Sequence, residues 1–229
     1  EAMMQDTKEF QDALYNEIIS RIKQTDESVP YLDNGYYYYT RFEEGKEYPV
    51  YCRKKGSLEA TEEVLLNVNE MAEGHDYYQV AGLSVSPDNQ KIAYGVDTVS
   101  RRKYTVYFKD LVSGEILPDA IPVTTGVAYW ANDNKTIFYT QKDEETLRPY
   151  KVFRHILNYP ATSDVLIYHE TDDTYNTFVY KSKSDQYIFL GSSSTLSDEY
   201  RYLDANKPKG DFTIIQPRER NLEYSVDHF

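Results

Sequence analysis

The sequence predicts a mainly β fold, a partial β-propeller preceded by one amphipathic helix. The chief observation is a phrase that returns every 45–51 residues along the 229-residue chain, at 84–94, 129–139 and 181–190. Each copy reads as a strand, a polar turn rich in Asp, Asn and Ser, and a second strand with apolar and aromatic residues. Repeats of about 40–50 residues with four short strands each are typical of propeller blades.

The second observation is an excess of tyrosine, 24 residues in all. Tyrosine suits a pleated, half-buried surface, so most of these residues are interpreted as sheet residues. A stacking surface for sugars or single-stranded nucleic acid is the alternative. The net charge of −13 argues against nucleic acid, because phosphate binding requires a basic patch. It favours cationic partners instead.

The cysteine count and the hydropathy pattern limit the possible disulfides, metal sites and cellular location of the protein. Cys52 is the single cysteine, which excludes an intrachain disulfide and a cysteine-based metal site. No apolar run reaches the roughly 18–20 residues of a membrane span, so no membrane association is expected. A reducing, cytoplasmic location is expected, or a periplasmic one if an export signal was removed upstream of Glu1.

A helix is predicted from Asp6 to Lys23, because apolar residues recur there at three- and four-residue steps. These residues are Phe10, Leu14, Ile18, Ile19 and Ile22. Pro30 then directs the chain into an extended conformation. The helix has no counterpart among the repeats. Residues 1–31 are therefore expected to form a separate helix and linker, and residues 32–229 an incomplete propeller.

Strands are expected without interruption after the linker. The first group comprises Tyr36–Arg41, Tyr48–Arg53 and Glu63–Asn67. Three four-stranded units follow: Gln79–Val85, Lys91–Val96, Lys103–Lys109 and a strand near Ile121; Gly126–Trp130, Thr136–Gln141, Tyr150–His155 and Asp164–Tyr168; Asn176–Lys181, Tyr187–Gly191, Glu199–Leu203 and Asp211–Ile215. Leu222–Phe229 is interpreted as the opening strand of a further blade. Because an unclosed arc leaves bare strand edges, the chain is expected to be part of a longer protein.

Catalytic motifs are lacking. The sequence contains no Gly-x-Ser-x-Gly elbow, Walker loop, Rossmann glycine pattern, His-Glu-x-x-His or EF-hand spacing. The four histidines, His75, His155, His169 and His228, are scattered. His155 and His169 could face each other across the outer strands of one blade and bind a metal, but a structural role is favoured. No catalytic, cofactor-binding or metal-binding residue is named, and no cofactor is expected.

Charged and polar clusters fall in the predicted connections. The acidic ones are Glu43-Glu44, Asp143-Glu144-Glu145 and Asp172-Asp173. They could bind Ca²⁺ or attract basic peptides, although solvated loop tips are favoured. Asp88-Asn89 and Asp133-Asn134 recur at equivalent positions and are interpreted as turn formers. Arg101-Arg102-Lys103 is interpreted as a hairpin tip, with a contact to another domain as the alternative, and Trp130 is expected in the core.

Two long phrases carry a resemblance to a known family. Residues 21–31 read RIKQTDESVPY and residues 34–53 read NGYYYYTRFEEGKEYPVYCR. They closely resemble the amino-terminal part of the oligopeptidases B, also called protease II, a group within the prolyl oligopeptidase family of serine peptidases. Residues 83–88 and 222–228 resemble phrases of the same family's propeller.

The resemblance implies a seven-bladed propeller, of which three to four blades are present, inserted between an amino-terminal segment and a carboxy-terminal α/β-hydrolase domain. It implies that the propeller restricts access of short peptides to a Ser-Asp-His triad that cleaves after Lys or Arg. The hydrolase domain is absent here, so the fragment is expected to be inactive. Acidic loops such as Glu43-Glu44 would help attract basic peptides. Without the hydrolase domain the apolar face of the helix and one strand edge are exposed, and both are expected to cause self-association.

Two alternatives remain open. The chain could be an independent propeller-type binding module, or the propeller of another peptidase of the same family, such as a prolyl oligopeptidase or a dipeptidyl peptidase. Closure of the propeller distinguishes the first alternative, because a free-standing module must complete its last blade by pairing it with its first blade. No second strand is expected after Leu222–Phe229. The phrases between residues 21 and 53 favour the oligopeptidases B.

Overall fold

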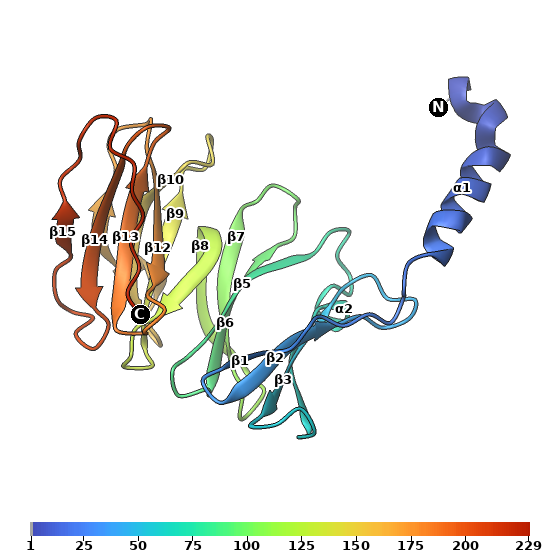
Figure 1. The fold of residues 1–229 in the computed structure, drawn as a ribbon, viewed down its shortest axis with the longest axis horizontal. Coiled ribbons are helices and arrows are strands. Elements are labelled where there is room, and N and C mark those ends of the chain that lie inside the picture. Colours follow the sequence, from blue (N-terminus) through green and yellow to red (C-terminus); the bar gives the residue numbers. More distant parts are fainter. Residues whose placement is uncertain (1) are drawn as a thin grey trace. The chain divides into compact units, whose positions relative to one another are not determined.

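The computed structural model describes residues 2–229, which form two compact units (Figure 1). Unit 1 spans Glu1–Glu73 and unit 2 spans Gly74–Phe229. Unit 2 consists mainly of antiparallel strands, and unit 1 combines an antiparallel sheet with a helical segment, so the predicted fold class is confirmed. Among the described helices, none is long and apolar enough to cross a membrane.

The helical part of unit 1 is a 3₁₀ helix, η1 (Ala2–Thr7), followed by an α-helix, α1 (Lys8–Ser20). The helix predicted over Asp6–Lys23 is present: its first two residues belong to η1, and α1 ends three residues earlier than predicted. The N-cap residue supplies no side-chain hydrogen bond to the first turn, and α1 ends where the N–H of Arg21 bonds to a carbonyl three residues back. Every residue of α1 is exposed.

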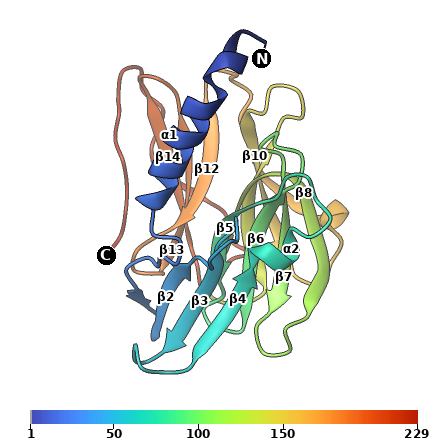
Figure 2. The same ribbon diagram turned by 90° about the vertical axis from the view of Figure 1, so that its right-hand side faces the viewer.

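Unit 1 also contains a four-stranded sheet in the order β1-β2-β3-β4 (Figure 2). The elements are β1 (Tyr31–Asp33), β2 (Tyr36–Arg41), β3 (Val50–Lys55) and β4 (Glu62–Asn67), followed by the one-turn helix α2 (Val68–Met71). The sequence analysis missed β1. The turn that joins it to β2 is Asn34-Gly35, with φ of 42° and 80°, and an Asn-Gly pair is a strong hairpin signal. β3 begins two residues later than predicted, because Pro49 has no N–H to pair and Tyr48 donates its N–H to Asn69.

Seven strands of unit 2 form one continuous antiparallel sheet, in which sequence neighbours pair from β5 to β11. The strands are β5 (Gln79–Val85), β6 (Lys91–Asp97), β7 (Tyr104–Asp110), β8 (Ile116–Trp130), β9 (Thr136–Lys142), β10 (Pro149–Ile156) and β11 (Val165–His169); a 3₁₀ helix, η2 (Ala161–Ser163), precedes β11. These strands cover two predicted blades. The strand near Ile121 and the strand Gly126–Trp130, which were predicted separately, form the single strand β8.

The long strand β8 serves the two blades in succession. Its first part pairs with β7 alone, so Pro118 and Pro122 lie on a free edge where their missing N–H groups are tolerated. Its last part, Ala128–Trp130, pairs with β9 as an inner strand. Between these parts the backbone bends at Gly126, with φ of 89°, and approaches Gly82 so closely that a Cβ on Gly82 would clash.

The third sheet contains β12 (Asn176–Lys181), β13 (Tyr187–Ser193), β14 (Asp198–Asp204) and β15 (Thr213–Gln216) in sequence order. The prediction of a strand at Leu222–Phe229 is wrong. This segment runs beside the sheet, where Ser184 donates its N–H to the carbonyl of His228 and the hydroxyl of Tyr180 bonds to the carbonyl of Val226. A strand requires a ladder with a neighbour, and no described residue forms one with this segment.

Two apolar clusters fill the core of unit 2, one on each face of β9. Ile137 belongs to the first cluster and its neighbour Phe138 to the second, as expected for successive residues of a strand. Trp130 lies in the first cluster with 1% of its surface exposed, so its predicted core position is confirmed. Its indole N–H donates to the carbonyl of Ser84 at 2.9 Å.

Polar turns connect the blades of unit 2. Asp88 accepts a hydrogen bond from the N–H of Gln90, and Asp133 accepts from Thr136, which confirms both as turn formers. The first two turns also bond to the following blade, and the third bonds to the carboxy-terminal segment. These links run from the N–H of Asp88 to Asn134, from the amide of Asn132 to the carbonyl of Asp185, and from the N–H of Lys183 to Asp227. The repeated turn therefore fixes both its own hairpin and the next blade.

Candidate functional site

The amino-terminal helix presents an exposed apolar surface, here called the α1 stripe. It consists of Phe10, Leu14 and Ile18 of α1 and of Ile22, two residues beyond the end of α1, with exposed fractions of 69%, 44%, 50% and 53%. An isolated helix of 13 residues is only marginally stable in water. Contiguous exposed apolar surface is typical of an interaction site. The α1 stripe is therefore a candidate docking surface.

A buried polar cluster joins the two blades that share β8, with Asp119 from the first part of β8 and the other members from the second blade. It is named the His155 cluster and contains Asp119, Tyr139, His155 and Asp164. The Nδ1 of His155 lies 2.7 Å from an oxygen of Asp164, and its Nε2 lies 3.1 Å from Oδ1 of Asp119. Both nitrogens face carboxylate oxygens, an arrangement that favours the doubly protonated imidazolium, in which both nitrogens donate. Tyr139 donates its hydroxyl to the other oxygen of Asp164 at 2.9 Å.

The pKa of His155 reflects two opposing effects. Burial alone would lower it, but the hydrogen bonds and charges of Asp164 and Asp119 outweigh burial and raise the pKa above its ordinary value. Burial and the neighbouring Asp164 also raise the pKa of Tyr139, which keeps its hydroxyl protonated. Phe108 stacks on the imidazole with ring centroids 5.8 Å apart and completes the enclosure.

The histidine pair considered from the sequence does not form. His169 lies opposite Lys151 in the β10–β11 ladder, four residues along β10 from His155. It contacts the ring of Tyr150 instead. Among the described residues, no group of three or more His, Cys, Asp or Glu side chains is arranged to hold a metal ion. The partners of His155 were missed because Asp119 precedes it by 36 residues and no spacing rule relates them.

A second buried cluster connects β11 with the end of the third sheet. It is named the Glu170 cluster and contains Tyr168, Glu170, Ser192 and Arg218. The carboxylate of Glu170 accepts from Arg218 at 2.5 Å, from Ser192 at 2.5 Å and from Tyr168 at 2.8 Å. Arg218 also lies 3.6 Å from the ring centroid of Tyr175, within cation–π range.

The pKa of Glu170 shows that this carboxylate is ionised at neutral pH. Burial would raise its pKa, but the hydrogen bonds from Arg218, Ser192 and Tyr168 lower it to about 2. The sequence analysis missed this pair as well, because 48 residues separate Glu170 from Arg218. The cluster therefore joins the segment after β11, the last strand of one blade, to the segment after β15, the last strand of the next.

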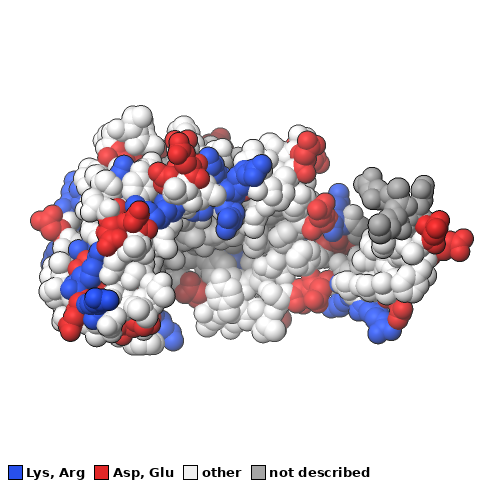
Figure 3. All heavy atoms as spheres, turned by 90° about the horizontal axis from the view of Figure 1, so that it is seen from above, with Lys and Arg blue, Asp and Glu red and all other residues white. Residues whose placement is uncertain are grey.

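The charged loops have mainly structural contacts. The loop that contains Arg101-Arg102-Lys103 is a hairpin tip, and its backbone N–H groups donate to the buried carboxylate of Asp97. Asp143 and Asp172 accept hydrogen bonds from residues of their own turns, while Glu43 pairs with Arg41. Acidic and basic side chains are interspersed over the face shown in Figure 3.

Four antiparallel four-stranded groups, two of which share β8, define the chain as a β-propeller domain that carries an amino-terminal helix. Comparisons with known proteins agree. The family model for the prolyl oligopeptidase, N-terminal beta-propeller domain matches residues 1–229. The chain therefore belongs to the prolyl oligopeptidase family, within the portion that this domain represents.

Individual relatives show which members of the family this chain is similar to. Dipeptidyl aminopeptidase BI of Pseudoxanthomonas mexicana is 42% identical over 243 residues, covering 100% of this chain and 34% of the relative. Protease 2 of Moraxella lacunata is 34% identical, covering 99% and 34%. The structure of oligopeptidase B from Leishmania major matches with a TM-score of 0.94 and 34% identity, covering 99% of this chain and 32% of that one. The chain thus spans about a third of the length of the curated relatives it matches.

Proposed function

We propose that the chain is the amino-terminal helix and propeller portion of a serine peptidase that cleaves short peptides. In this proposal the propeller restricts access of substrates, and the α1 stripe docks on a carboxy-terminal α/β-hydrolase domain of the same protein. The catalytic residues belong to that domain, so the 229-residue chain by itself has no peptidase activity.

One observation carries the proposal: the family match extends over the whole chain, while the chain covers only about a third of each relative. The exposed α1 stripe supports it, because four exposed apolar residues along and just beyond a helix suit a permanent partner surface. Amide hydrolysis of this class requires an activated serine and an oxyanion hole. No sequence motif for either is present in the chain.

Two substrate classes are supported by different relatives. Similarity to protease 2 and to oligopeptidase B favours cleavage within short peptides after Lys or Arg, and this is the leading candidate. The relative with 42% identity is named a dipeptidyl aminopeptidase, which favours release of dipeptides from a free amino terminus. The net charge of −13 suits basic peptides in either case, because it increases their rate of encounter.

The test compares two peptide amides on the protein that carries both portions and on this chain alone. One amide has a blocked amino terminus and Arg before the scissile bond, and the other is a free-amino dipeptide amide with an apolar second residue. The proposal expects turnover of the Arg amide by the longer protein and none by the chain. Preference for the dipeptide amide would select the second candidate. Turnover by the chain, or labelling of one of its serines by an active-site reagent, would contradict the proposal.

A further inference from the structure

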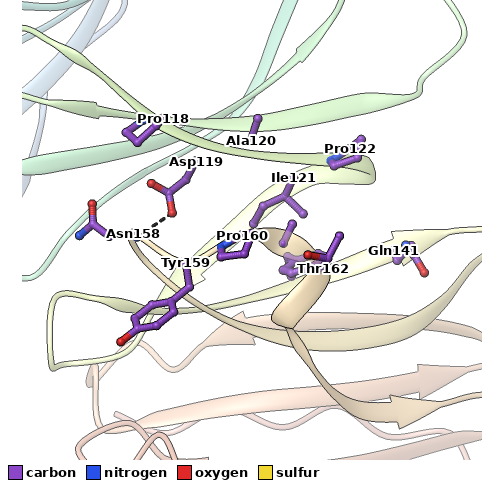
Figure 4. Close-up of a pocket in the computed structure, with 12 residues that line it drawn as sticks. Pro118, Asp119, Ala120, Ile121, Pro122, Gln141, Asn158, Tyr159, Pro160 and Thr162 are labelled. Carbon is purple, nitrogen blue, oxygen red and sulfur yellow. Dashed lines mark hydrogen bonds between the residues drawn. The ribbon is translucent and has the colours of Figure 1, made fainter.

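A cavity of about 740 Å³ lies beside the His155 cluster, between the first part of β8 and the connection that follows β10 (Figure 4). Its lining residues are Pro118, Asp119, Ala120, Ile121, Pro122, Tyr139, Gln141, Asn158, Tyr159, Pro160, Ala161 and Thr162. Most of them are apolar or aromatic, and three are prolines with fixed φ. The walls are therefore stiff and suit an aliphatic chain.

One lining residue has an unused hydrogen-bonding group. Asp119 points from β8 toward the 158–162 segment, and 6% of its surface is exposed (Figure 4). Its Oδ1 accepts from His155 and from the N–H of Asn158 at 2.7 Å. Its Oδ2 is buried and has no partner among the described residues. A buried carboxylate oxygen without a donor is costly, so this atom favours a ligand that brings a donor.

Other polar groups of the cavity are also free. Within the described chain, the side chains of Gln141, Asn158 and Thr162 line the cavity and make no hydrogen bond. Each carries an oxygen that can accept from a ligand. The cavity thus combines one carboxylate oxygen with neutral acceptors, a composition that suits a donor-rich group with an apolar stem.

The charge of the site is negative. Asp119 and Asp164 carry two negative charges against the single positive charge of His155, and Tyr139 is neutral. The residues that line the cavity include no Lys or Arg. An anion is therefore disfavoured, and a monovalent cation would balance the cluster. A divalent metal is disfavoured because the described residues offer no group of three ligands.

We propose that this cavity binds a primary alkylammonium group, with the ammonium donating to Oδ2 of Asp119 and the alkyl stem against the prolines and Tyr159. A guanidinium fits less well, because it prefers both oxygens of a carboxylate and Oδ1 is already occupied. An ammonium needs only scattered single acceptors. A lysine side chain of a peptide and a free polyamine share this chemistry. The site is independent of the peptidase activity proposed above.

Calorimetric titration of the chain tests the proposal. The probes are butylammonium, spermidine, and a short Pro-Lys-Pro peptide, with butanol and the norleucine peptide as uncharged matches. The site predicts saturable binding of the ammonium probes and none of their matches. Whichever of spermidine and the lysine peptide binds more tightly identifies the source of the ammonium group. The fluorescence of Trp130 gives a second readout, because Trp130 contacts Phe108, which stacks on His155.

Two variants test the location of the site. Asp119→Asn keeps an oxygen for His155 and removes the charge, and it should weaken ammonium binding at least about tenfold. Thr162→Phe narrows the cavity from a lining position outside the His155 cluster, and it should weaken binding similarly even if the first variant folds poorly. Asp173→Asn removes an exposed carboxylate elsewhere and should bind as the native chain does.

The results that overturn the proposal are equally definite. Binding of butanol as tight as that of butylammonium would show that charge is irrelevant. Unchanged affinity in folded Asp119→Asn and Thr162→Phe would place any binding elsewhere. Absence of saturable heat or fluorescence change with every ammonium probe would also refute the site.

Discussion

The amino-terminal helix and the blades of unit 2 use apolar residues in opposite ways. In β9, Ile137 and Phe138 point to opposite faces and both are fully buried, so the strand is covered on its two sides. In α1 the apolar residues share one face, and none of them is buried. The blades therefore obtain their hydrophobic stabilisation within the unit, whereas the α1 stripe is available to a partner surface.

The blades differ from the helix in their polar contacts as well. Unit 2 contains two buried ionic clusters, and hydrogen bonds link the turns of consecutive blades. The polar side-chain contacts described for the helix are exposed, among them the ion pairs of Lys8 with Asp12 and of Glu17 with Arg21, and such pairs contribute little in water. Substitutions should therefore affect stability strongly in the clusters, moderately in the turns and weakly on the helix.

The largest effect is expected for Arg218→Ala in the Glu170 cluster. Removing Arg218 leaves the buried carboxylate of Glu170 without its cation, and breaking such a pair costs about 3–5 kcal/mol. Urea unfolding followed by circular dichroism measures the loss. Arg220→Ala, at an exposed position of the same segment, is the matched control and should change stability by less than about 0.5 kcal/mol. Equal effects of the two substitutions would show that the cluster is not a major contributor.

The two clusters should respond to pH in opposite directions. The folded pKa of His155 is raised, so its contribution is complete below its unfolded pKa and is lost as pH rises through the folded pKa. The folded pKa of Glu170 is lowered to about 2, so its contribution is complete above its unfolded pKa and is lost as pH falls toward 2. Asp119, Asp164, Tyr139 and Phe108 surround the imidazole.

Urea unfolding across a pH series tests this contrast with His155→Gln. Substitution should lower the unfolding free energy most at low pH, where the contribution of His155 is complete, and should therefore reduce the decline on the alkaline side. His169→Gln, which alters an exposed histidine, is the control and should reproduce the native profile. An alkaline decline that is the same in the native chain and in His155→Gln would disprove the role of His155.

A smaller effect is expected for Asn132→Ala in the turn between β8 and β9. The amide of Asn132 donates to the carbonyl of Asp185 and to Asn206 in the next blade. Loss of these exposed bonds should lower the free energy of unfolding by about 1 kcal/mol. Asn176→Ala is the control, because no hydrogen bond of its side chain is found in the described structure. A change in Asn132→Ala no larger than in the control would mean that the turns do not couple the blades.

The repeats allowed most strands to be predicted, because Asp88 and Asp133 mark turns by bonding their own backbone. The continuity of β8 could not be predicted in the same way. Proline and glycine usually interrupt strands. Pro118 and Pro122 are tolerated on a free edge and Gly126 at a bend, and these positions depend on the tertiary structure. The Asn-Gly turn before β2 was a local signal that was overlooked.

The candidate sites also differ in whether they could be predicted from the sequence. The α1 stripe followed from helical periodicity alone, since its residues recur every four positions. The His155 and Glu170 clusters did not, because their partners lie 36 and 48 residues apart and meet only through the packing of the blades. Family resemblance was visible in the phrases between residues 21 and 53, yet these contain no member of either cluster.

The central claim is that the α1 stripe is a docking surface while the blades are self-contained. Leu14→Glu with Ile18→Lys places a favourable pair at i and i+4, so it charges the stripe and preserves the helix. Asp12→Glu with Asn16→Lys places the same pair on another face and is the control.

Light scattering at several protein concentrations measures the mass of each variant. The account predicts that the native chain and the control associate as concentration rises, and that the stripe variant remains a monomer with unchanged circular dichroism of the sheets. A native chain that stays monomeric at the highest concentration, or a stripe variant that associates as the native chain does, would contradict it.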